Sequence, residues 1–260
     1  MQLKFISLNL WLGGILQDNI IDFLEKENAD IVVLQEVYSS PDRTIPSHNR
    51  SLEFLQELDY PYHHFAPALI DNYPWGKITE GNAVLSRFPI KTSNVTFFDK
   101  PFDPNKLREP FDPSTFPTTP RNLEHVVLET PAGEVNVFNL QGVWDLDGDS
   151  LSPQRQQMSD VILREIKGKE SVILAGDTNA KYTNPAMRAI EEHLTNVFGD
   201  TLETTFNMKR KTNPGYATAV VDMIYISPSI TIVNKTCPDV DVSDHLPLIA
   251  TLNIPREKAV

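Results

Sequence analysis

Short runs of apolar residues recur along the chain, and many of them stop at a polar residue. Residues 30–36 hold four consecutive apolar positions, which is the pattern of a strand buried on both faces, and residues 3–9 form an apolar run that ends in a polar residue. Residues 171–175 form a similar run that stops at Gly176-Asp177. Further strands are predicted at residues 62–67, 82–86, 92–98, 123–130, 135–140, 218–227, 230–233 and 248–254.

Helices are predicted singly between these groups of strands. Apolar residues follow helical spacing within residues 20–24 and 52–58. Ser152 and Asn184 each precede a proline, and a capping side chain followed by proline is a frequent helix start. Because strands outnumber helices, we predict an α/β fold in which two mainly antiparallel sheets pack as a sandwich with helices outside.

Three segments interrupt this pattern. Residues 71–76 separate two strands and are predicted to form a loop, and residues 101–120 hold six prolines that exclude long regular elements. The acidic segment 145–149 has the glycine of a calcium-binding loop too early and lacks its closing glutamate. It is therefore predicted to be a solvated turn.

The composition limits the classes of function. The chain of 260 residues is 40% hydrophobic and has no linker or repeat, so residues 1–260 are predicted to form one domain. The net charge of −12 argues against affinity through broad neutralisation of phosphates, although it allows a local basic groove. The single cysteine excludes an intrachain disulfide, and no apolar run approaches the ~20 residues of a membrane span. We expect a cytoplasmic monomer without a membrane anchor.

Polar residues with catalytic potential follow several of the predicted strands. A carboxylate beside an imidazole, as in Asp244-His245, suits metal-assisted phosphate chemistry because Asp binds hard cations and His exchanges protons near neutral pH. Similar side chains lie at the ends of other apolar runs: Asn9, Glu36, Asn139, Gln141, Asp177 and Asn179; Asp222 instead opens one. Polar side chains drawn from many strand ends are typical of an active site carried by a sheet.

In their order along the chain, these motifs resemble the endonuclease/exonuclease/phosphatase superfamily. The resemblance runs from Leu3 to Leu252 and includes Asn9, Gln35-Glu36, residues 81–89, Asn139, residues 176–179, Asp222 and Ser243-Asp244-His245. It implies a four-layered α/β sandwich and metal-dependent cleavage of phosphate esters, usually with Mg²⁺ and with Mn²⁺ as an alternative. The superfamily includes DNase I-like nucleases, abasic-site endonucleases, sphingomyelinases, inositol polyphosphate phosphatases, deadenylases and tyrosyl-DNA phosphodiesterases.

The chemistry of phosphate ester hydrolysis suggests a role for each residue. A cation must offset the negative charge that repels an attacking hydroxide, and Mg²⁺ prefers oxygen ligands. Glu36 is the first candidate ligand, with Asn9 and Asp244 beside it. Asp177 can accept the proton of the attacking water, and Asn179 can hold a phosphoryl oxygen through its amide.

The remaining catalytic candidates are His245, Asp222, Asn139 and Gln141. His245 is predicted to stabilise charge at phosphorus, with Asp222 fixing its tautomer. At Asn139-Leu140-Gln141 the sequence departs from the superfamily, in which many members have Asn-x-His. Glutamine can donate a hydrogen bond to a phosphoryl oxygen but carries neither a charge nor a transferable proton. Gln141 therefore leaves two interpretations open, a site that works with an amide and a member that has lost activity.

Candidate substrate-binding residues lie outside the strand ends. Lys209, Arg210 and Lys211 form a basic run that can clamp phosphates, with a solvated turn as the equally weighted alternative. Trp11 and Trp144 each closely follow a site motif and can form walls that stack a base or ring. Asn82 belongs to the 81–89 stretch and is assigned to substrate binding through the resemblance.

We therefore predict a Mg²⁺-dependent phosphodiesterase or nuclease that acts on DNA or RNA. A phosphoesterase for a small or lipid phosphoester is the first alternative, and the acidic composition suits it better. A phosphate-binding protein whose catalysis is impaired by Gln141 is the second alternative.

Overall fold

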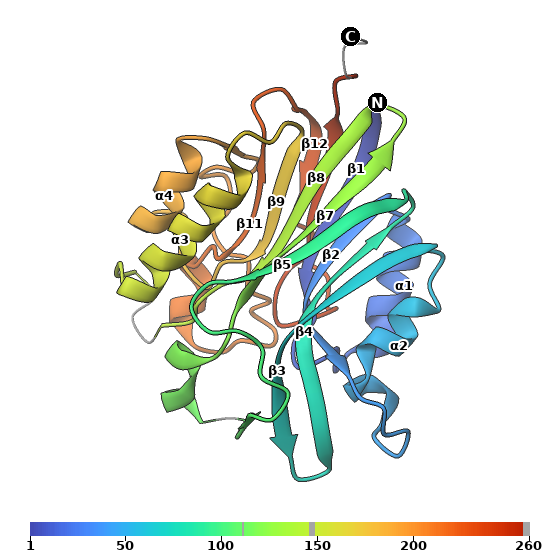
Figure 1. Cartoon of the computed structure of the whole chain (residues 1–260), viewed down its shortest axis with the longest axis vertical. Helices are drawn as coiled ribbons and strands as arrows, with labels where there is room; N and C mark the ends of the chain where they lie inside the picture. Colours follow the sequence, from blue (N-terminus) through green and yellow to red (C-terminus); the bar gives the residue numbers. More distant parts are fainter. Residues whose placement is uncertain (111, 146–148, 257–260) are drawn as a thin grey trace.

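The strands form two sheets in the computed structural model, which describes residues 1–110, 112–145 and 149–256 (Figure 1). Residues 146–148 of the predicted acidic turn lie outside this description. In spatial order, the first sheet contains β12 (Thr231–Thr236), β13 (Leu248–Asn253), β1 (Gln2–Asn9), β2 (Ile31–Ser39), β4 (Gly76–Ser86), β3 (Tyr62–Tyr73) and β6 (Leu107–Arg108). The second contains β10 (Thr195–Asn196), β11 (Asp222–Ile226), β9 (Val172–Asp177), β8 (Gly133–Gln141), β7 (Asn122–Thr130) and β5 (Ile90–Phe97). Both sheets are mixed, because β1–β2, β3–β6 and β8–β9 are parallel pairs among antiparallel neighbours.

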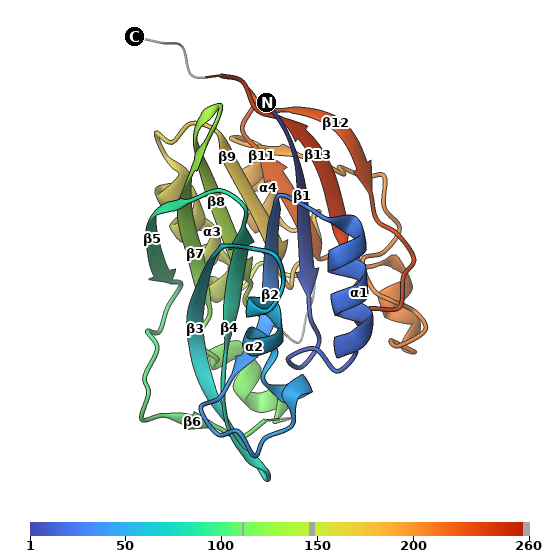
Figure 2. The same ribbon diagram turned by 90° about the vertical axis from the view of Figure 1, so that its right-hand side faces the viewer.

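Helices cover the two outer faces of the paired sheets (Figures 1 and 2). The α-helices are α1 (Gln17–Glu27), α2 (Ser51–Gln56), α3 (Pro153–Ile166) and α4 (Pro185–Glu191), and the 3₁₀ helices are η1 (Ser47–Asn49), η2 (Pro113–Thr118) and η3 (Pro214–Thr218). One apolar cluster joins α1 and α2 to the first sheet, and another joins α3 and α4 to the second sheet. A third cluster fills the space between the sheets. The four-layered α/β sandwich is therefore confirmed. None of the helices described is both long and apolar enough to cross a membrane.

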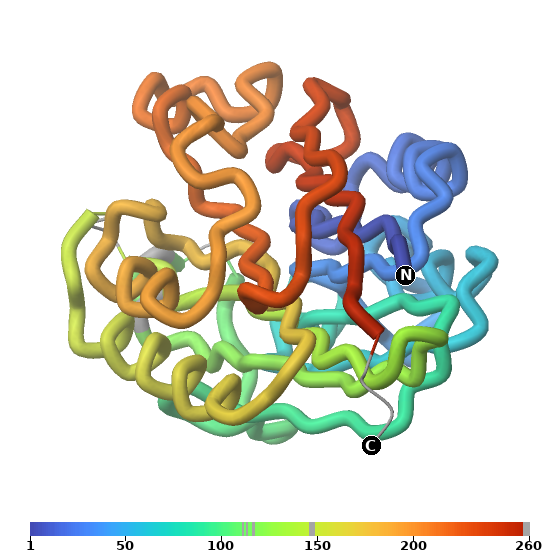
Figure 3. The backbone as a smooth tube through the Cα atoms, turned by 90° about the horizontal axis from the view of Figure 1, so that it is seen from above, coloured from blue at the N-terminus to red at the C-terminus, as the bar shows by residue number. Residues whose placement is uncertain are grey.

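The apolar side chains of β1 are divided between two clusters, one on each face of its sheet. Leu3 and Phe5 belong to the cluster between the sheets, while Ile6 and Leu8 belong to the cluster beneath α1 and α2. Successive side chains of a strand point to opposite faces, so a strand covered on both sides needs apolar residues at every position. Seen from above, β1 lies beside β13, with Phe5 opposite Ala250 (Figure 3).

The predicted starts of α3 and α4 are confirmed by their capping contacts. The Ser152 hydroxyl accepts a hydrogen bond from the backbone N–H of Arg155 at 3.3 Å. The Asn184 side chain accepts one from the backbone N–H of Ala186 at 3.0 Å. In both helices a proline follows the cap, where its missing N–H costs no intrahelical bond.

The prediction of a loop at residues 71–76 is wrong. β3 and β4 continue through this segment as one long hairpin that turns at Pro74 and Trp75. The Trp75 ring stacks on Tyr73 with centroids 4.4 Å apart, and the Tyr73 hydroxyl bonds that of Tyr38 at 2.7 Å. Contacts with residues distant in sequence stabilise this extension, so the local pattern did not reveal it.

Candidate active site

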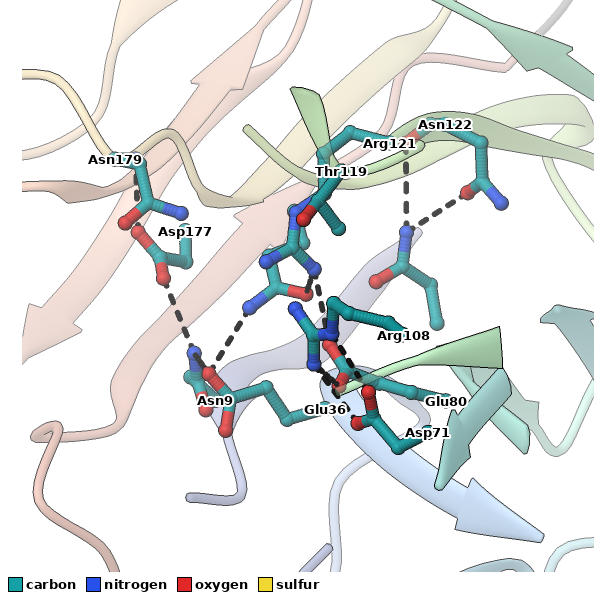
Figure 4. Close-up of polar contacts among 12 residues, drawn as sticks. Asn9, Glu36, Asp71, Glu80, Arg108, Thr119, Arg121, Asn122, Asp177 and Asn179 are labelled. Atoms are coloured by element: carbon teal, nitrogen blue, oxygen red, sulfur yellow. Dashed lines mark hydrogen bonds and ion pairs between the residues drawn. The ribbon is translucent and has the colours of Figure 1, made fainter. Parts of the chain in front are cut away.

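A cavity of about 320 Å³ opens near the ends of β8 and β9 and takes its walls from both sheets (Figure 4). Of the residues singled out in the sequence, it brings together Trp11, Glu36, Gln141, Trp144, Asp177, Asn179, Lys211, Asp244 and His245. Asn9 and Asp222 adjoin the cavity, because each bonds to a residue of its wall. Side chains from the beginning, middle and end of the chain thus meet in one place.

A bulge in β2 aims Glu36 into the cavity. The register between β2 and β4 shifts between Leu34 and Val37, and Glu36 has a φ of +54°. A β-bulge re-aims a side chain, and a non-glycine residue in the left-handed region marks a backbone held by its surroundings. Glu36 Oε2 accepts a hydrogen bond from the backbone N–H of Leu12 at 2.7 Å, and Oε1 accepts one from Asn9 Nδ2 at 3.1 Å. Burial and the nearby carboxylates of Glu80 and Asp244 raise the pKa of Glu36.

Gly176, just before Asp177, allows the end of β9 to lie close to β8. Gly176 has a φ of +142°, and a Cβ there would lie 2.0 Å from the carbonyl oxygen of Leu140 on β8, so a larger residue would collide. Asp177 accepts hydrogen bonds from Asn9 Nδ2 at 3.1 Å and from the backbone N–H of Asn179 at 2.9 Å. Burial raises the pKa of Asp177 to about 6. This carboxylate can therefore exchange a proton near neutral pH.

Asn179 lies beside Asp177 in a left-handed backbone conformation, with a φ of +50°. Its Nδ2 donates to the carbonyl oxygen of Gly142 at 3.1 Å. A Cβ at Gly142 would lie 2.1 Å from the carbonyl oxygen of Thr178, so the two loops meet closely only because residue 142 is glycine. The contact holds the Asn179 amide at the wall of the cavity.

Asp222 orients His245. The Asp222 Oδ2 lies 2.8 Å from Nδ1 of the imidazole, and the ring packs against Phe206 with centroids 4.6 Å apart. The register of β11 with β9 places Asp222 opposite Asp177. Burial lowers the pKa of His245, but the carboxylates of Asp222, Asp177 and Asp244 raise it to about 10. A protonated imidazole thus borders the cavity at neutral pH.

The oxygen atoms around Glu36 fit a hard divalent cation. Glu36 and Asp244 line the same cavity, and the Asn9 amide bonds to Glu36. The Lys211 ammonium lies 2.7 Å from Asp244 Oδ2, and although burial lowers its pKa, Asp244 and Glu36 contribute to a net increase. Positive charge is therefore favoured at this position, and carboxylate and amide oxygens are ligands that Mg²⁺ accepts.

A second group with metal-ligand chemistry consists of Asp177, Asp222 and His245, whose ligand atoms lie within 4.8 Å of one another. All three residues are buried. Here, however, the Nδ1 of His245 is already bonded to Asp222. This contact suits proton transfer and charge stabilisation better than binding of a cation.

Asn139 and Asn82 do not line the cavity. Asn139 lies in β8 of the second sheet, and its Nδ2 donates to the carbonyl oxygens of Leu34 and Ala83 in the first sheet, both at 3.0 Å. Asn82 of β4 donates to Asn122 Oδ1 of β7 at 3.0 Å. Both amides therefore join the two sheets.

Two members of the predicted basic run pair outside the cavity. Lys209 Nζ lies 3.0 Å from Asp239 Oδ1, and Arg210 binds both carboxylate oxygens of Asp241 at 2.8 and 2.5 Å. Lys211 alone of the three borders the cavity.

A group of charged residues at the cavity was missed in the sequence. Arg108 binds both oxygens of Asp71, at 2.6 and 2.8 Å, and bonds Glu80 at 3.0 Å. Arg121 bonds Glu80 at 2.9 Å (Figure 4). It also bonds Gln141. Glu80 was the available signal in the sequence, because it is a glutamate within an apolar strand. A buried carboxylate requires a cationic partner, so Glu80 predicts a nearby arginine or lysine. Other lining residues not predicted are Leu12, Tyr73, Pro110, Phe206 and Tyr216.

The sequence matches the model of the Endonuclease/Exonuclease/phosphatase family over residues 6–245, which is most of the chain. The chain belongs to this family. The family name joins nucleases and phosphatases, enzymes that hydrolyse phosphate esters. No curated protein sequence is significantly similar to the chain.

Solved structures of the family share the fold. An endonuclease/exonuclease/phosphatase from Beutenbergia cavernae has a TM-score of 0.77 at 21% identity, covering 98% of this chain and 72% of its own. The mannosyl-6-phosphatase Bt3783 from Bacteroides thetaiotaomicron has a TM-score of 0.69 at 20% identity, covering 97% and 100%. TDP2 from D. rerio, solved with a single-strand DNA product, also has a TM-score of 0.69, at 18% identity and covering 97% and 99%. At these identities the likeness concerns the fold alone.

Proposed function

We propose that this protein is a divalent-metal-dependent phosphoesterase that hydrolyses a small phosphoester. The observation that supports the reaction is the convergence of Glu36 and Asp244 with Asp177 and the Asp222–His245 pair at one cavity. This set combines oxygen ligands, a carboxylate that exchanges protons near neutral pH and a protonated imidazole. Each of the three can accelerate the hydrolysis of a phosphate ester.

Glu36, with Asp244 and Asn9, would hold the cation. Mg²⁺ fits these oxygen ligands, and Mn²⁺ is an alternative. When bound, the cation would supply positive charge beside the phosphoryl group. Asn9 links this group to the proton acceptor, because its Nδ2 bonds both Glu36 Oε1 and Asp177 Oδ2 at 3.1 Å.

Asp177 would accept the proton of the attacking water. Its two carboxylate oxygens are held by separate donors, which fix the carboxylate plane. The Asn179 amide stands at the same wall and would contact a phosphoryl oxygen. His245 would stabilise the negative charge that develops in the transition state, with Asp222 holding the ring in position.

The sequence predicts DNA or RNA as the first substrate class. The charge distribution instead favours a small substrate over long nucleic acid. Lys209 and Arg210 already pair with carboxylates outside the cavity, and the net charge is −12. A protein that tracks a nucleic acid backbone needs a broad basic surface.

The end of a single nucleic acid strand is the second candidate substrate. Aromatic residues in the cavity wall, Trp11 and Trp144, favour it, because base stacking binds single strands. The fold does not choose between the two classes, since the mannosyl-6-phosphatase and TDP2 structures have the same TM-score of 0.69 to this chain.

A substrate panel tests the proposal. The purified protein is incubated with Mg²⁺ or Mn²⁺ and with p-nitrophenyl phosphate, bis(p-nitrophenyl) phosphate, sugar phosphates, nucleotides and a single-stranded oligonucleotide. We expect turnover of a small phosphoester that EDTA abolishes and that Glu36→Gln reduces by at least about 10²-fold. Glu134→Gln, an exposed carboxylate on β8, is the matched control and should keep wild-type turnover. Turnover that survives EDTA, or none with any substrate, would contradict the proposal.

A further inference from the structure

A second hollow, of about 600 Å³, lies beside the cavity of the candidate active site. The two share Leu12 and Tyr73 as lining residues. We call this hollow the aromatic groove, and its lining consists of Leu12, Ile15, Tyr38, His48, Asn49, Tyr73, Pro74 and Trp75. Part of its wall is the tip of the β3–β4 hairpin, which extends beyond the other strands of the first sheet (Figure 1). The groove therefore continues the cavity toward the hairpin.

Leu12 connects the groove to the proposed cation ligand. Its backbone N–H donates to Glu36 Oε2 at 2.7 Å, and its φ is +49°. The preceding Trp11 also has a positive φ, +61°. Two successive non-glycine residues in the left-handed region are costly, so their surroundings must hold them there. This turn fixes the position of the groove relative to Glu36.

Two stacked rings, those of Tyr73 and Trp75, line the groove. Their centroids lie 4.4 Å apart and their planes are within 8° of parallel. The Tyr73 hydroxyl bonds that of Tyr38 at 2.7 Å, and both tyrosines belong to one apolar cluster with Ile45. Tyr73 is therefore held in place, whereas Trp75 is 42% exposed. An exposed indole that rests on a fixed ring offers a flat surface to a further ring.

The groove lacks the charges that bind phosphates. Among the residues that the structure describes, no Asp, Glu, Lys or Arg lines it. Ile15, which is also 42% exposed, adds apolar surface. His48 and Asn49, whose side chains bond each other at 3.2 Å, supply polar groups that can contact the edge of a ring. Such a lining suits an uncharged ring better than a continuing nucleic acid strand, whose phosphates need cations.

We propose that the aromatic groove binds an uncharged aromatic ring in the alcohol part of the substrate, while the phosphoryl group lies at Glu36. The inference rests on the proposed phosphoesterase function and narrows the substrate to a small phosphoester that carries a nucleobase or an aryl group. Trp75 and Ile15 would be covered by this ring, and removing their apolar surface from water would contribute to affinity. The groove thus selects among phosphoesters by the part of the molecule that the reaction does not change.

The first test measures binding of phosphonates, which lack the cleavable ester bond, by calorimetry in the presence of Mg²⁺. Phenylalkylphosphonates with one to four methylene groups are compared with alkylphosphonates of the same chain length. For at least one length, wild type should bind the phenyl compound about 5- to 150-fold more tightly, which is the effect of stacking one ring. Trp75→Ala should lose most of this preference and bind the alkylphosphonate within about twofold of wild type.

Tyr62→Ala is the matched control, because Tyr62 is an exposed aromatic residue at the far end of β3. It should keep the wild-type preference for the ring. Three results overturn the inference: no tighter binding of any phenyl compound by wild type, no binding of any phosphonate at millimolar concentration, or a preference that survives in Trp75→Ala. Should Trp75→Ala fail to fold, Ile15→Asp carries the test, since a carboxylate in the groove should also abolish the preference.

The second test distinguishes the two kinds of ring by turnover. Trp75→Ala should lower kcat/KM for a substrate with a ring about 5- to 150-fold more than for ribose 5-phosphate, which has no aromatic ring. A selective loss with adenosine 5′-monophosphate identifies a nucleobase, and one with phenylbutyl phosphate alone identifies an aryl group. Equal losses with all three substrates would contradict a role of the groove in selecting a ring.

The two proposals can fail separately. If wild type turns over none of the panel substrates, the proposed function fails, while the phosphonate comparison still tests the groove. If wild type is active and Trp75→Ala matches it with every substrate and phosphonate, only the inference on the groove is overturned.

Discussion

The Oδ2 of Asp222 lies 2.8 Å from Nδ1 of His245, and this contact fixes which ring nitrogen is left for a ligand. Nδ1 is engaged, so any contact with substrate must use Nε2. The same carboxylate contributes to the raised pKa of the imidazole, about 10, which keeps the ring protonated at neutral pH.

Asp222→Asn should reduce kcat by about 10²–10⁴-fold, with a smaller change in KM. The amide keeps a hydrogen-bonding group at the same position but removes the negative charge that favours the imidazolium. Steady-state kinetics on the best small substrate measures the effect. Asp239→Asn, at the exposed partner of Lys209, serves as the control. An unchanged kcat in Asp222→Asn would contradict the proposed role of a protonated His245 in the reaction.

Gln141→His should lower kcat by about tenfold, because it disturbs a charge-assisted contact between Arg121 and the amide. If the chain were instead a member inactivated by Gln141, restoring a histidine should raise kcat by about 10²–10⁴-fold. The two expectations have opposite signs, so kcat at saturating Mg²⁺ decides between them.

The double variant Lys209→Ala/Arg210→Ala should leave the salt dependence of oligonucleotide binding unchanged, because both cations are paired with Asp239 and Asp241. Lys211→Ala, at the cavity, should reduce the salt slope by about one phosphate contact. The measurement is the affinity for a fluorescent single-stranded oligonucleotide at several salt concentrations. A salt slope that falls by about two phosphate contacts in the double variant would instead support the prediction that Lys209 and Arg210 clamp nucleic acid.

Glu124→Gln should stabilise the protein more at pH 7.5 than at pH 4.5. Glu124 is fully buried, and burial raises its pKa above the usual 4.5, although hydrogen bonds from His64 and Asn139 oppose the shift. With a raised pKa in the folded state, its contribution to stability is complete below the unfolded pKa and is lost as pH rises through the folded pKa. Glutamine does not titrate, and its oxygen and NH₂ can bond to the same two neighbours.

Urea denaturation of wild type and Glu124→Gln at both pH values measures this difference in the free energy of unfolding. Glu134→Gln, an exposed carboxylate, is the matched control and should show no such pH dependence. An equal effect of Glu124→Gln at both pH values would mean that Glu124 does not change protonation in this range.

The layered fold could be predicted from the sequence because its causes are local. Consecutive apolar residues at 31–34 alternate between the inner and outer clusters, and Ser152 forms the cap that its position before proline suggests. Glu36 stood out for a similar reason, since a carboxylate after a buried strand is costly unless it has a partner.

The roles of Arg121 and Asn139 depend on partners distant in sequence. Arg121 follows the proline-rich segment, and only the packed sheets bring it to Glu80 and Gln141. Asn139 occurs at the position that the motif suggests, yet the opposite sheet provides carbonyl oxygens for its amide. A sequence motif identifies the residue type, whereas the face of the strand decides whether the side chain reaches the cavity or the other sheet.

Pairing of β1 with β13 leaves the first sheet incomplete until the last of its strands has been translated. β1 lies between β2 and β13, and the backbone N–H of Ile254 bonds the carbonyl oxygen of Met1 at 2.7 Å. Until β13 has left the ribosome, β1 has an unpaired edge, and such edges favour association with other chains. His245 is translated just before β13 and reaches Asp222 in the same late stage. A nascent chain therefore carries Glu36 and Asp177 long before His245 can join them at the cavity.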